Sequence, residues 1–122
     1  MLSYALSKAR QHDSGGRQRV YAVATDHKGN IIAEAGNSYA TSHPLQKKYA
    51  ARAGRPEACF LHAEIHLLAK LAKSRKVCNT VFIARAKRDG SEGLAKPCPI
   101  CAMALEAAGI VNIVYTGGNI EQ

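Results

Sequence analysis

The feature that most constrains the fold of this 122-residue chain is the alternation of short apolar runs with segments of helical periodicity. The apolar runs are rich in Val, Ile and Ala, as in strands covered on both faces, whereas the helical segments repeat apolar residues at i, i+3, i+4 and i+7. This pattern predicts one α/β domain over residues 1–122, a three-layer α-β-α sandwich with a mixed, mainly four-stranded sheet. The expected helices are 2–11, a turn at 46–52, 60–73 and 98–108, and the expected strands are 19–25, 30–35, 80–84 and 110–115.

The order of these elements indicates how the strands are joined. The first two strands flank the polar turn 26–30, which is a β-hairpin signal. The last two strands are separated by a helix, so we expect them to be parallel through a right-handed crossover. Residues 38–57, which contain two prolines and a glycine, predict a long excursion of the kind that lines binding sites. Gly117-Gly118 is expected to begin a tail.

Composition limits the environment and the partners. The first residues lack the unbroken apolar stretch of a secretory signal, and no segment has the roughly 20 apolar residues that a membrane span needs. We therefore expect a soluble, cytoplasmic protein with no membrane partner. Four cysteines in a reducing compartment favour metal or redox chemistry over disulfides. The net charge of +8 is spread over every segment. It indicates either a solvated basic surface or attraction to nucleotide phosphates or a nucleic-acid backbone, and composition does not separate these.

One candidate metal-binding motif is the run Pro97-Cys98-Pro99-Ile100-Cys101, at the start of a predicted helix. Cysteines at i and i+3 face the same way, and the positive end of a helix stabilises the thiolates that zinc binds. A redox pair of the thioredoxin kind is the alternative, because that motif also begins a helix. It would give no role to the second motif described below.

The second motif is His62-Ala63-Glu64, at the start of the preceding predicted helix. Residues two apart point away from each other within a helix, but at its first turn both can border one cavity. His62 is then the third ligand, while Glu64 stays free to reach bound water. Three protein ligands with one open position are typical of a catalytic zinc site. His66 is expected to be a core residue rather than a ligand.

Together the two motifs resemble the signature of the cytidine-deaminase-like superfamily of zinc-dependent nucleobase deaminases, over about residues 20–116. The resemblance implies a hydrolase that releases ammonia from cytosine or adenine, with Zn²⁺ held by His62, Cys98 and Cys101. Glu64 would be the catalytic acid and base. The resemblance also implies a substrate-binding surface, for which the candidates are the backbone at Ala63 against the base, Asn37 against the sugar, and His43 in the excursion.

The substrate is expected to be a cytosine nucleotide, dCMP, CMP or cytidine, converted to its uracil product. Basic residues in the excursion are candidates to hold one phosphate: Lys47, Lys48, Arg52 and Arg55. The alternative is a deaminase acting on cytosine or adenine in single-stranded DNA, RNA or tRNA, which the spread of charge and the loop 85–88 favour. A second alternative is a non-catalytic, zinc-stabilised binding module, although such a module has no use for Glu64.

The resemblance further implies a fifth strand after residues 110–115, which the sequence pattern lacks. A neighbouring subunit is therefore expected to help complete the pocket, in a homo-oligomer.

Overall fold

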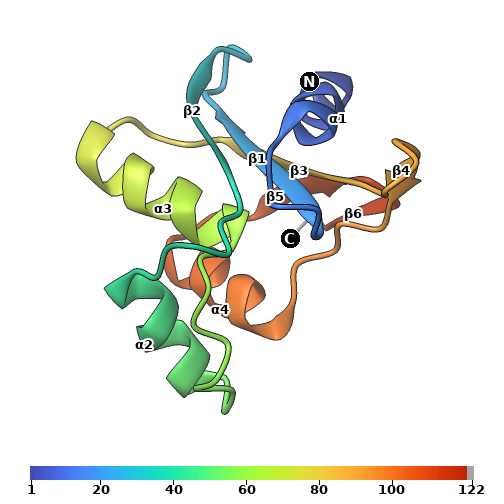
Figure 1. Cartoon of the computed structure of the whole chain (residues 1–122). Coiled ribbons are helices and arrows are strands. Elements are labelled where there is room, and N and C mark those ends of the chain that lie inside the picture. The colour runs from blue at the N-terminus through green and yellow to red at the C-terminus, as the bar shows by residue number, and fades with distance from the viewer. Residues whose placement is uncertain (121–122) are drawn as a thin grey trace.

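A computed structural model describes residues 1–120 and shows a twisted sheet with helices on both faces (Figure 1). Helix α1 covers one face, and α2, α3 and α4 lie on the other. The expected α/β sandwich is therefore confirmed. The elements are α1 (Leu2–Gln11), β1 (Arg19–Thr25), β2 (Ile31–Gly36), α2 (Pro44–Arg52), α3 (Ala63–Ser74), β3 (Thr80–Ala86), β4 (Glu92–Gly93), α4 (Pro99–Ala107), β5 (Asn112–Tyr115) and β6 (Gly118–Ile120).

The sheet has the order β2-β1-β3-β5-β6, and the two-residue strand β4 pairs with β3. β1 is antiparallel to both β2 and β3, whereas β3 and β5 are parallel across α4, as the crossover predicted. The prediction of a tail from Gly117 onwards was wrong, because β6 pairs antiparallel with β5. The sheet is therefore larger than the expected four strands. Both additional strands are too short to show a periodicity in the sequence.

The helices begin and end close to the predicted positions for identifiable local reasons. The turn expected at 46–52 is a full helix that begins at Pro44, because proline suits the first position of a helix and His43 caps it. Gly109 follows the end of α4 with a positive φ of 76°, a conformation that glycine adopts without steric cost. No helix within residues 1–120 is long and apolar enough to cross a membrane.

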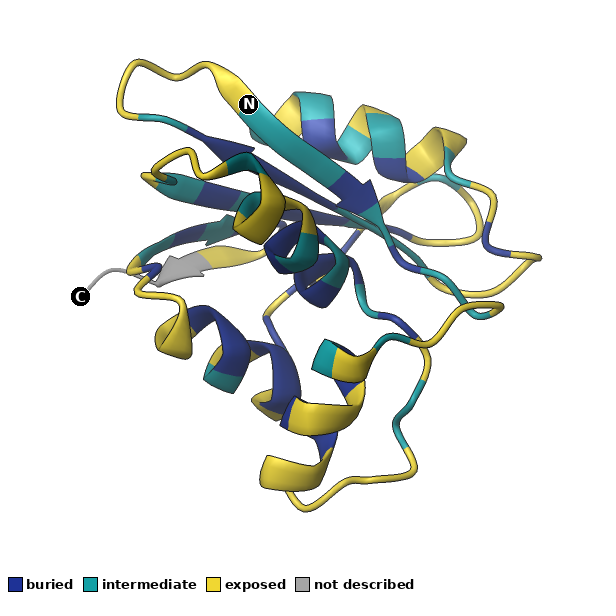
Figure 2. Ribbon diagram, turned by 90° about the vertical axis from the view of Figure 1, so that its left-hand side faces the viewer, coloured by how far each residue is buried: buried dark blue, intermediate teal, exposed yellow. Residues whose placement is uncertain are grey.

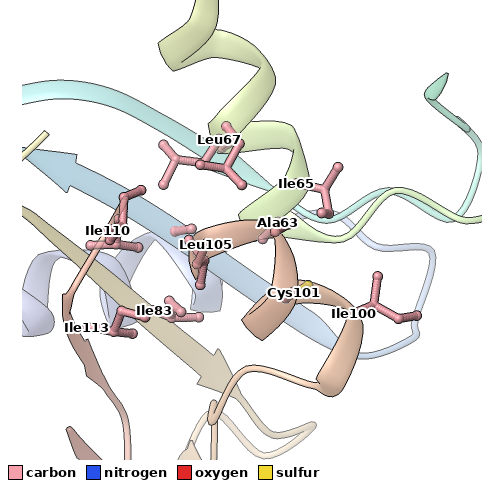
Figure 3. Close-up of a cluster of buried hydrophobic side chains, with 14 of the residues drawn as sticks. Ala63, Ile65, Leu67, Ile83, Ile100, Cys101, Leu105, Ile110 and Ile113 are labelled. Atoms are coloured by element: carbon pink, nitrogen blue, oxygen red, sulfur yellow. The ribbon is translucent and has the colours of Figure 1, made fainter. Parts of the chain in front are cut away.

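The core is divided between the two faces of the sheet. The larger cluster packs α2, α3 and α4 against the sheet and contains its bulkiest fully buried side chains, among them Ile65, Leu67 and Leu105 (Figure 3). The smaller cluster, beneath α1, consists of Ala5, Ala9, Val23, Ala84 and Ala86. Figure 2 shows the helices buried on the sides that face the sheet and exposed on their outer sides. The candidate site lies at the edge of the larger cluster.

Candidate metal centre and active site

The two motifs lie at equivalent places on two neighbouring helices. His62 is the N-cap residue of α3, and Cys98 is the N-cap residue of α4. Both have extended backbone conformations, and neither side chain makes a capping hydrogen bond. An N-cap residue lies just outside the helical turn, so its side chain is not bound by the helical spacing that separates residues two apart. His62 and Glu64 can therefore border the same cavity.

Three possible ligand atoms converge where these helices begin. The Nδ1 atom of His62 lies 3.2 Å from the Sγ atom of Cys101 and 3.5 Å from that of Cys98. All three atoms lie within 4.8 Å of one another. Tetrahedral zinc, with bonds of about 2.3 Å to sulfur and 2.0–2.1 Å to nitrogen, spaces such donors roughly 3.5 Å apart. One imidazole and two sulfurs at this spacing fit Zn²⁺.

The electrostatics favour a thiolate at this centre. The hydrogen bond from Cys101 lowers the pKa of Cys98 to about 4, and the bond to His62 acts in the same direction. The same bond to Cys98, followed by burial, raises the pKa of Cys101. The hydrogen bond to Cys98 raises the pKa of His62. Because Cys98 begins α4, the partial positive charge of the helix N-terminus adds to this stabilisation. All four cysteines of the chain are free.

Glu64 lies in the first turn of α3, beside the three possible ligands. Its side chain is buried, with 6% of its surface exposed, and burial raises the pKa of its carboxyl group. No ion pair within residues 1–120 involves it. A buried carboxyl group without a cationic partner costs folding free energy, so its presence calls for a role other than stability.

A cavity of about 300 Å³ opens in front of Glu64, His62 and Cys98. Its volume lies at the lower end of the range for small-molecule sites. Its walls are mainly apolar, and its polar groups include Asn37, Gln18 and the exposed Lys96. The apolar lining comes from Val20, Ala58, Phe60, Leu61, Ala63 and Ala95. A flat, uncharged ring with a polar edge suits such a space.

The three residues expected to bind substrate are placed differently. Ala63 and Asn37 both line the cavity. The amide of Asn37 also joins β2 to β1, because its Oδ1 accepts from the Val20 N–H at 3.0 Å and its Nδ2 donates to the Gln18 carbonyl at 2.9 Å. His43 lies outside the cavity lining. Its Nδ1 instead accepts from the Leu45 N–H and caps α2.

Gln46 is a residue of the site that sequence reasoning missed. Its side chain is fully buried; it donates to the Ala58 carbonyl at 3.0 Å and accepts from the N–H of His62 at 3.1 Å. Gln46 therefore ties α2 to the residue that begins α3. A polar residue in the middle of an otherwise basic segment gave no periodic signal for this role.

His66 and the basic residues of the excursion 38–57 lie apart from the candidate metal centre. The Nδ1 of His66 lies 3.1 Å from the Gly36 carbonyl, which agrees with a structural role. None of the four basic residues of the excursion lines the cavity, and Arg55 is instead paired with Glu57 at 3.8 Å. The expectation that the excursion supplies a phosphate site at the cavity is therefore not supported by their placement.

Comparisons with known proteins agree with this geometry. The profile of a family described as the cytidine and deoxycytidylate deaminase zinc-binding region matches residues 1–117. A dCMP deaminase from the cyanophage S-TIM5, in its apo form, is similar in structure, with a TM-score of 0.58 and 20% identity over 93% of this chain and 80% of the other. A mutant cytidine deaminase from Mycobacterium tuberculosis has a TM-score of 0.57 and 16% identity over 99% and 90% of the two chains. The sequence has no match among curated proteins.

Proposed function

Because this chain belongs to the cytidine and deoxycytidylate deaminase family, and is thus a zinc-dependent hydrolase, we propose that it removes the amino group from the cytosine of a nucleotide such as dCMP. The observation that carries the proposal is the convergence of His62, Cys98 and Cys101 beside the buried Glu64, at the floor of a cavity. We assign the three as zinc ligands. A site with three protein ligands leaves a fourth position for water.

The reaction consumes water and releases ammonia, leaving the uracil product. Zn²⁺, when bound, acts as a Lewis acid that makes water a stronger nucleophile at neutral pH. The water oxygen forms a bond to C4 of the base, and the bond from C4 to the amino nitrogen breaks. Glu64 takes the proton that water gives up, delivers it to the ring nitrogen, and then helps the amine leave as ammonia. Such positioned acid–base help contributes typically about 10²–10⁴ in rate.

The cavity supports a planar base with a sugar behind it. Ala63 and Leu61 supply apolar wall close to the proposed ligands, while Asn37 lies at the end of β2. We propose that Ala63 contacts the base through its backbone and that Asn37 faces the sugar. Lys96 is the only cation in the cavity lining within residues 1–120, so it is the candidate to meet a phosphate on a free nucleotide. The expected homo-oligomer and cytoplasmic location stay predictions.

The decisive experiment compares Glu64→Gln with the wild type. Each protein is analysed for zinc, and ammonia release is measured with dCMP, CMP and cytidine. We expect Glu64→Gln to keep one zinc per chain and to lose at least about 10²-fold in turnover, because proton transfer is removed. Glu106→Gln is the matched control, since this glutamate is exposed on α4. Wild-type turnover retained by Glu64→Gln would refute the proposed mechanism.

The same experiment separates the enzyme from a non-catalytic zinc module. A structural module needs no carboxyl group beside its metal, and Glu64 would then be replaceable at no cost in any activity. If the wild type binds zinc but releases no ammonia from any cytosine or adenine substrate, the non-catalytic module is favoured. Loss of zinc from Glu64→Gln would instead make Glu64 a ligand.

A further inference from the structure

A second, basic cleft lies on the molecule outside the cavity described above. It has a volume of about 520 Å³ and lies where the loop after α1, the start of β1 and the end of β3 meet. Five cationic side chains line it: Arg17, Arg19, Arg85, Lys87 and Arg88. The carboxylate among its lining residues is Asp13, whose Oδ1 accepts from the Gly15 N–H. Positive charge is therefore in large excess.

The fold, rather than the sequence, gathers these cations. In the antiparallel pairing of β1 with β3, Arg19 lies opposite Ala86 and Val20 lies opposite Arg85. The guanidinium of Arg19 donates to the carbonyls of Arg10 and Lys87, so it is fixed within the protein. No ion pair within residues 1–120 neutralises the other four cations.

Arg85 lines the cleft with a side chain that is partly covered by the protein. Its Nε atom is buried and has no hydrogen-bond partner among the described residues. Its side chain lies over Gly93, where an added Cβ would come within 3.2 Å of it. Because Nε is covered by protein, it is out of reach of a ligand in the cleft, and Arg85 contributes positive charge there rather than a free donor at this atom.

A third hollow adjoins both the basic cleft and the catalytic cavity. It has a volume of about 700 Å³. It shares His12, Ser14 and Arg17 with the basic cleft, and Tyr39 and Phe60 with the cavity. One groove therefore runs from Glu64 past two aromatic rings to the arginines.

The groove offers one exposed aromatic ring, Phe60, with Tyr39 and Arg17 beside it. Phe60 is 46% exposed, and its ring lies 6.0 Å from that of Tyr39. The Arg17 guanidinium lies over the Tyr39 ring, 5.1 Å from its centre. Exposed aromatic rings beside cations are the combination by which proteins hold single-stranded nucleic acid, with bases on the rings and phosphates on the charges.

We propose that this groove binds single-stranded nucleic acid and presents one of its cytosines to the catalytic cavity. The inference rests on the proposed deaminase function and replaces the free nucleotide by a polynucleotide as the preferred substrate. A free nucleotide would occupy the 300 Å³ cavity and leave the hollow, the two rings and the basic cleft without a ligand. A strand uses all of them, because each further nucleotide adds one base to stack and one phosphate to neutralise.

The test uses a fluorescent 12-nucleotide strand with one cytosine, as DNA and as RNA, bound to the zinc-loaded protein. Glu64→Gln serves as the background so that the strand is not consumed. Lys87→Ala with Arg88→Ala should weaken binding about tenfold and reduce the slope of log affinity against log salt by about 1.4, since two phosphate contacts are lost at about 0.7 each. A DNA or an RNA preference would each support the proposal and identify the polymer.

The matched control is Lys28→Ala with Lys73→Ala, which removes the same charge from exposed lysines outside the groove. It should keep strand binding within about twofold, since a surface charge distant from a contact is largely screened. Thermal unfolding of both double variants checks the fold. An equal loss in the two pairs would overturn the proposal, because binding would then follow net charge alone.

Turnover separates this proposal from the proposed function. Wild-type protein that releases ammonia from dCMP but neither binds nor deaminates the strand would overturn the groove and leave the deaminase intact. Groove-dependent binding of the strand without ammonia from any substrate would contradict the deaminase and support the groove. We expect the wild type to deaminate the strand with a higher kcat/KM than dCMP. The double variant Lys87→Ala with Arg88→Ala should lose this advantage.

Discussion

The sheet carries a small core beneath α1 and a large core beneath α2, α3 and α4, and the two are held together differently. The α1 face relies on alanines and on a polar cluster, in which Glu34 accepts from the hydroxyls of Tyr4 and Tyr21 at 2.7–3.0 Å. The opposite face packs bulky aliphatic side chains such as Ile65 and Leu105. The candidate metal centre lies at the edge of this larger core. Tight aliphatic packing there fixes the two helix starts that place the ligands.

The largest difference between the faces should come from the metal. Cys98→Ser is expected to lose zinc and all deaminase activity. Its free energy of unfolding should fall by about 4 kcal/mol when free zinc is a thousandfold above the Kd of the wild type. Metal analysis and urea unfolding, with and without a chelator, measure both effects. Cys59→Ser is the control because this free thiol lies outside the cluster; a full zinc complement in Cys98→Ser would remove Cys98 from the ligand set.

The packing of the two faces of the sheet can be compared by replacing one leucine on each face with alanine. Leu105→Ala should lower the free energy of unfolding by about 3 kcal/mol, because a fully buried side chain is replaced by a cavity. Leu6→Ala, on α1, removes a side chain that is only half-buried and should cost about 1 kcal/mol. Urea unfolding midpoints give both values. Equal losses would show that α1 contributes as much as the larger core.

Gln46 tests whether α2 positions the metal centre. Gln46→Met leaves the N–H of His62 and the carbonyl of Ala58 unpaired, and should cost about 2 kcal/mol. Because this bond orients the residue that supplies a ligand, zinc affinity should also fall about tenfold. Competition with a chromophoric chelator measures the affinity. Gln11→Met, at the exposed end of α1, should change neither quantity.

The smallest effect concerns the pH dependence of the α1 face. Burial raises the pKa of Glu34, but the bonds from Tyr21 and Tyr4 and the charges of Lys8 and Lys70 outweigh it, so the pKa lies below 4.5. A carboxyl group with a lowered pKa stabilises the fold above its unfolded pKa, and this contribution disappears as the pH falls through the folded value.

At high pH the same cluster acts in the opposite direction. Burial, followed by the bond to Glu34, raises the pKa of Tyr21 above 10, so the contribution of Tyr21 to stability is present below pH 10 and is lost as the pH rises through the folded pKa.

Because the pKa of Glu34 is lowered in the folded protein, Glu34→Gln should lower the free energy of unfolding by about 1 kcal/mol at pH 7 and flatten its pH dependence between pH 3 and 5. Urea unfolding at several pH values measures this. An unchanged acid limb would show that Glu34 does not support α1.

The elements that the sequence predicted well are those with a local signal. The strands at 19–25 and 80–84 are continuous apolar runs. The helices predicted over 60–73 and 98–108 begin three residues and one residue later, at Ala63 and Pro99. The geometry of a helix start explains why His62 and Glu64 can share a cavity, whereas the meeting of His62 with Cys98 and Cys101 was inferred from the resemblance of the two motifs to the deaminase signature.

The features that the sequence did not predict depend on distant pairing. β4 and β6 are two and three residues long, and each exists only because a neighbouring strand offers free backbone groups. Arg17 and Arg85 look like two members of an even scatter of charge until the β1–β3 register places their segments side by side. Their gathering into one cleft could not be read from composition.

His62 and Cys98 each stand immediately before the first residue of a helix, which has a consequence for how freely this protein can diverge. The position of an N-cap residue depends on where its helix begins. It depends little on which side chains occupy the solvent-exposed face of that helix. Sequence drift in the bodies of α3 and α4 is therefore tolerable as long as their volumes are kept. A one-residue insertion immediately before either start, in contrast, would displace a ligand at once.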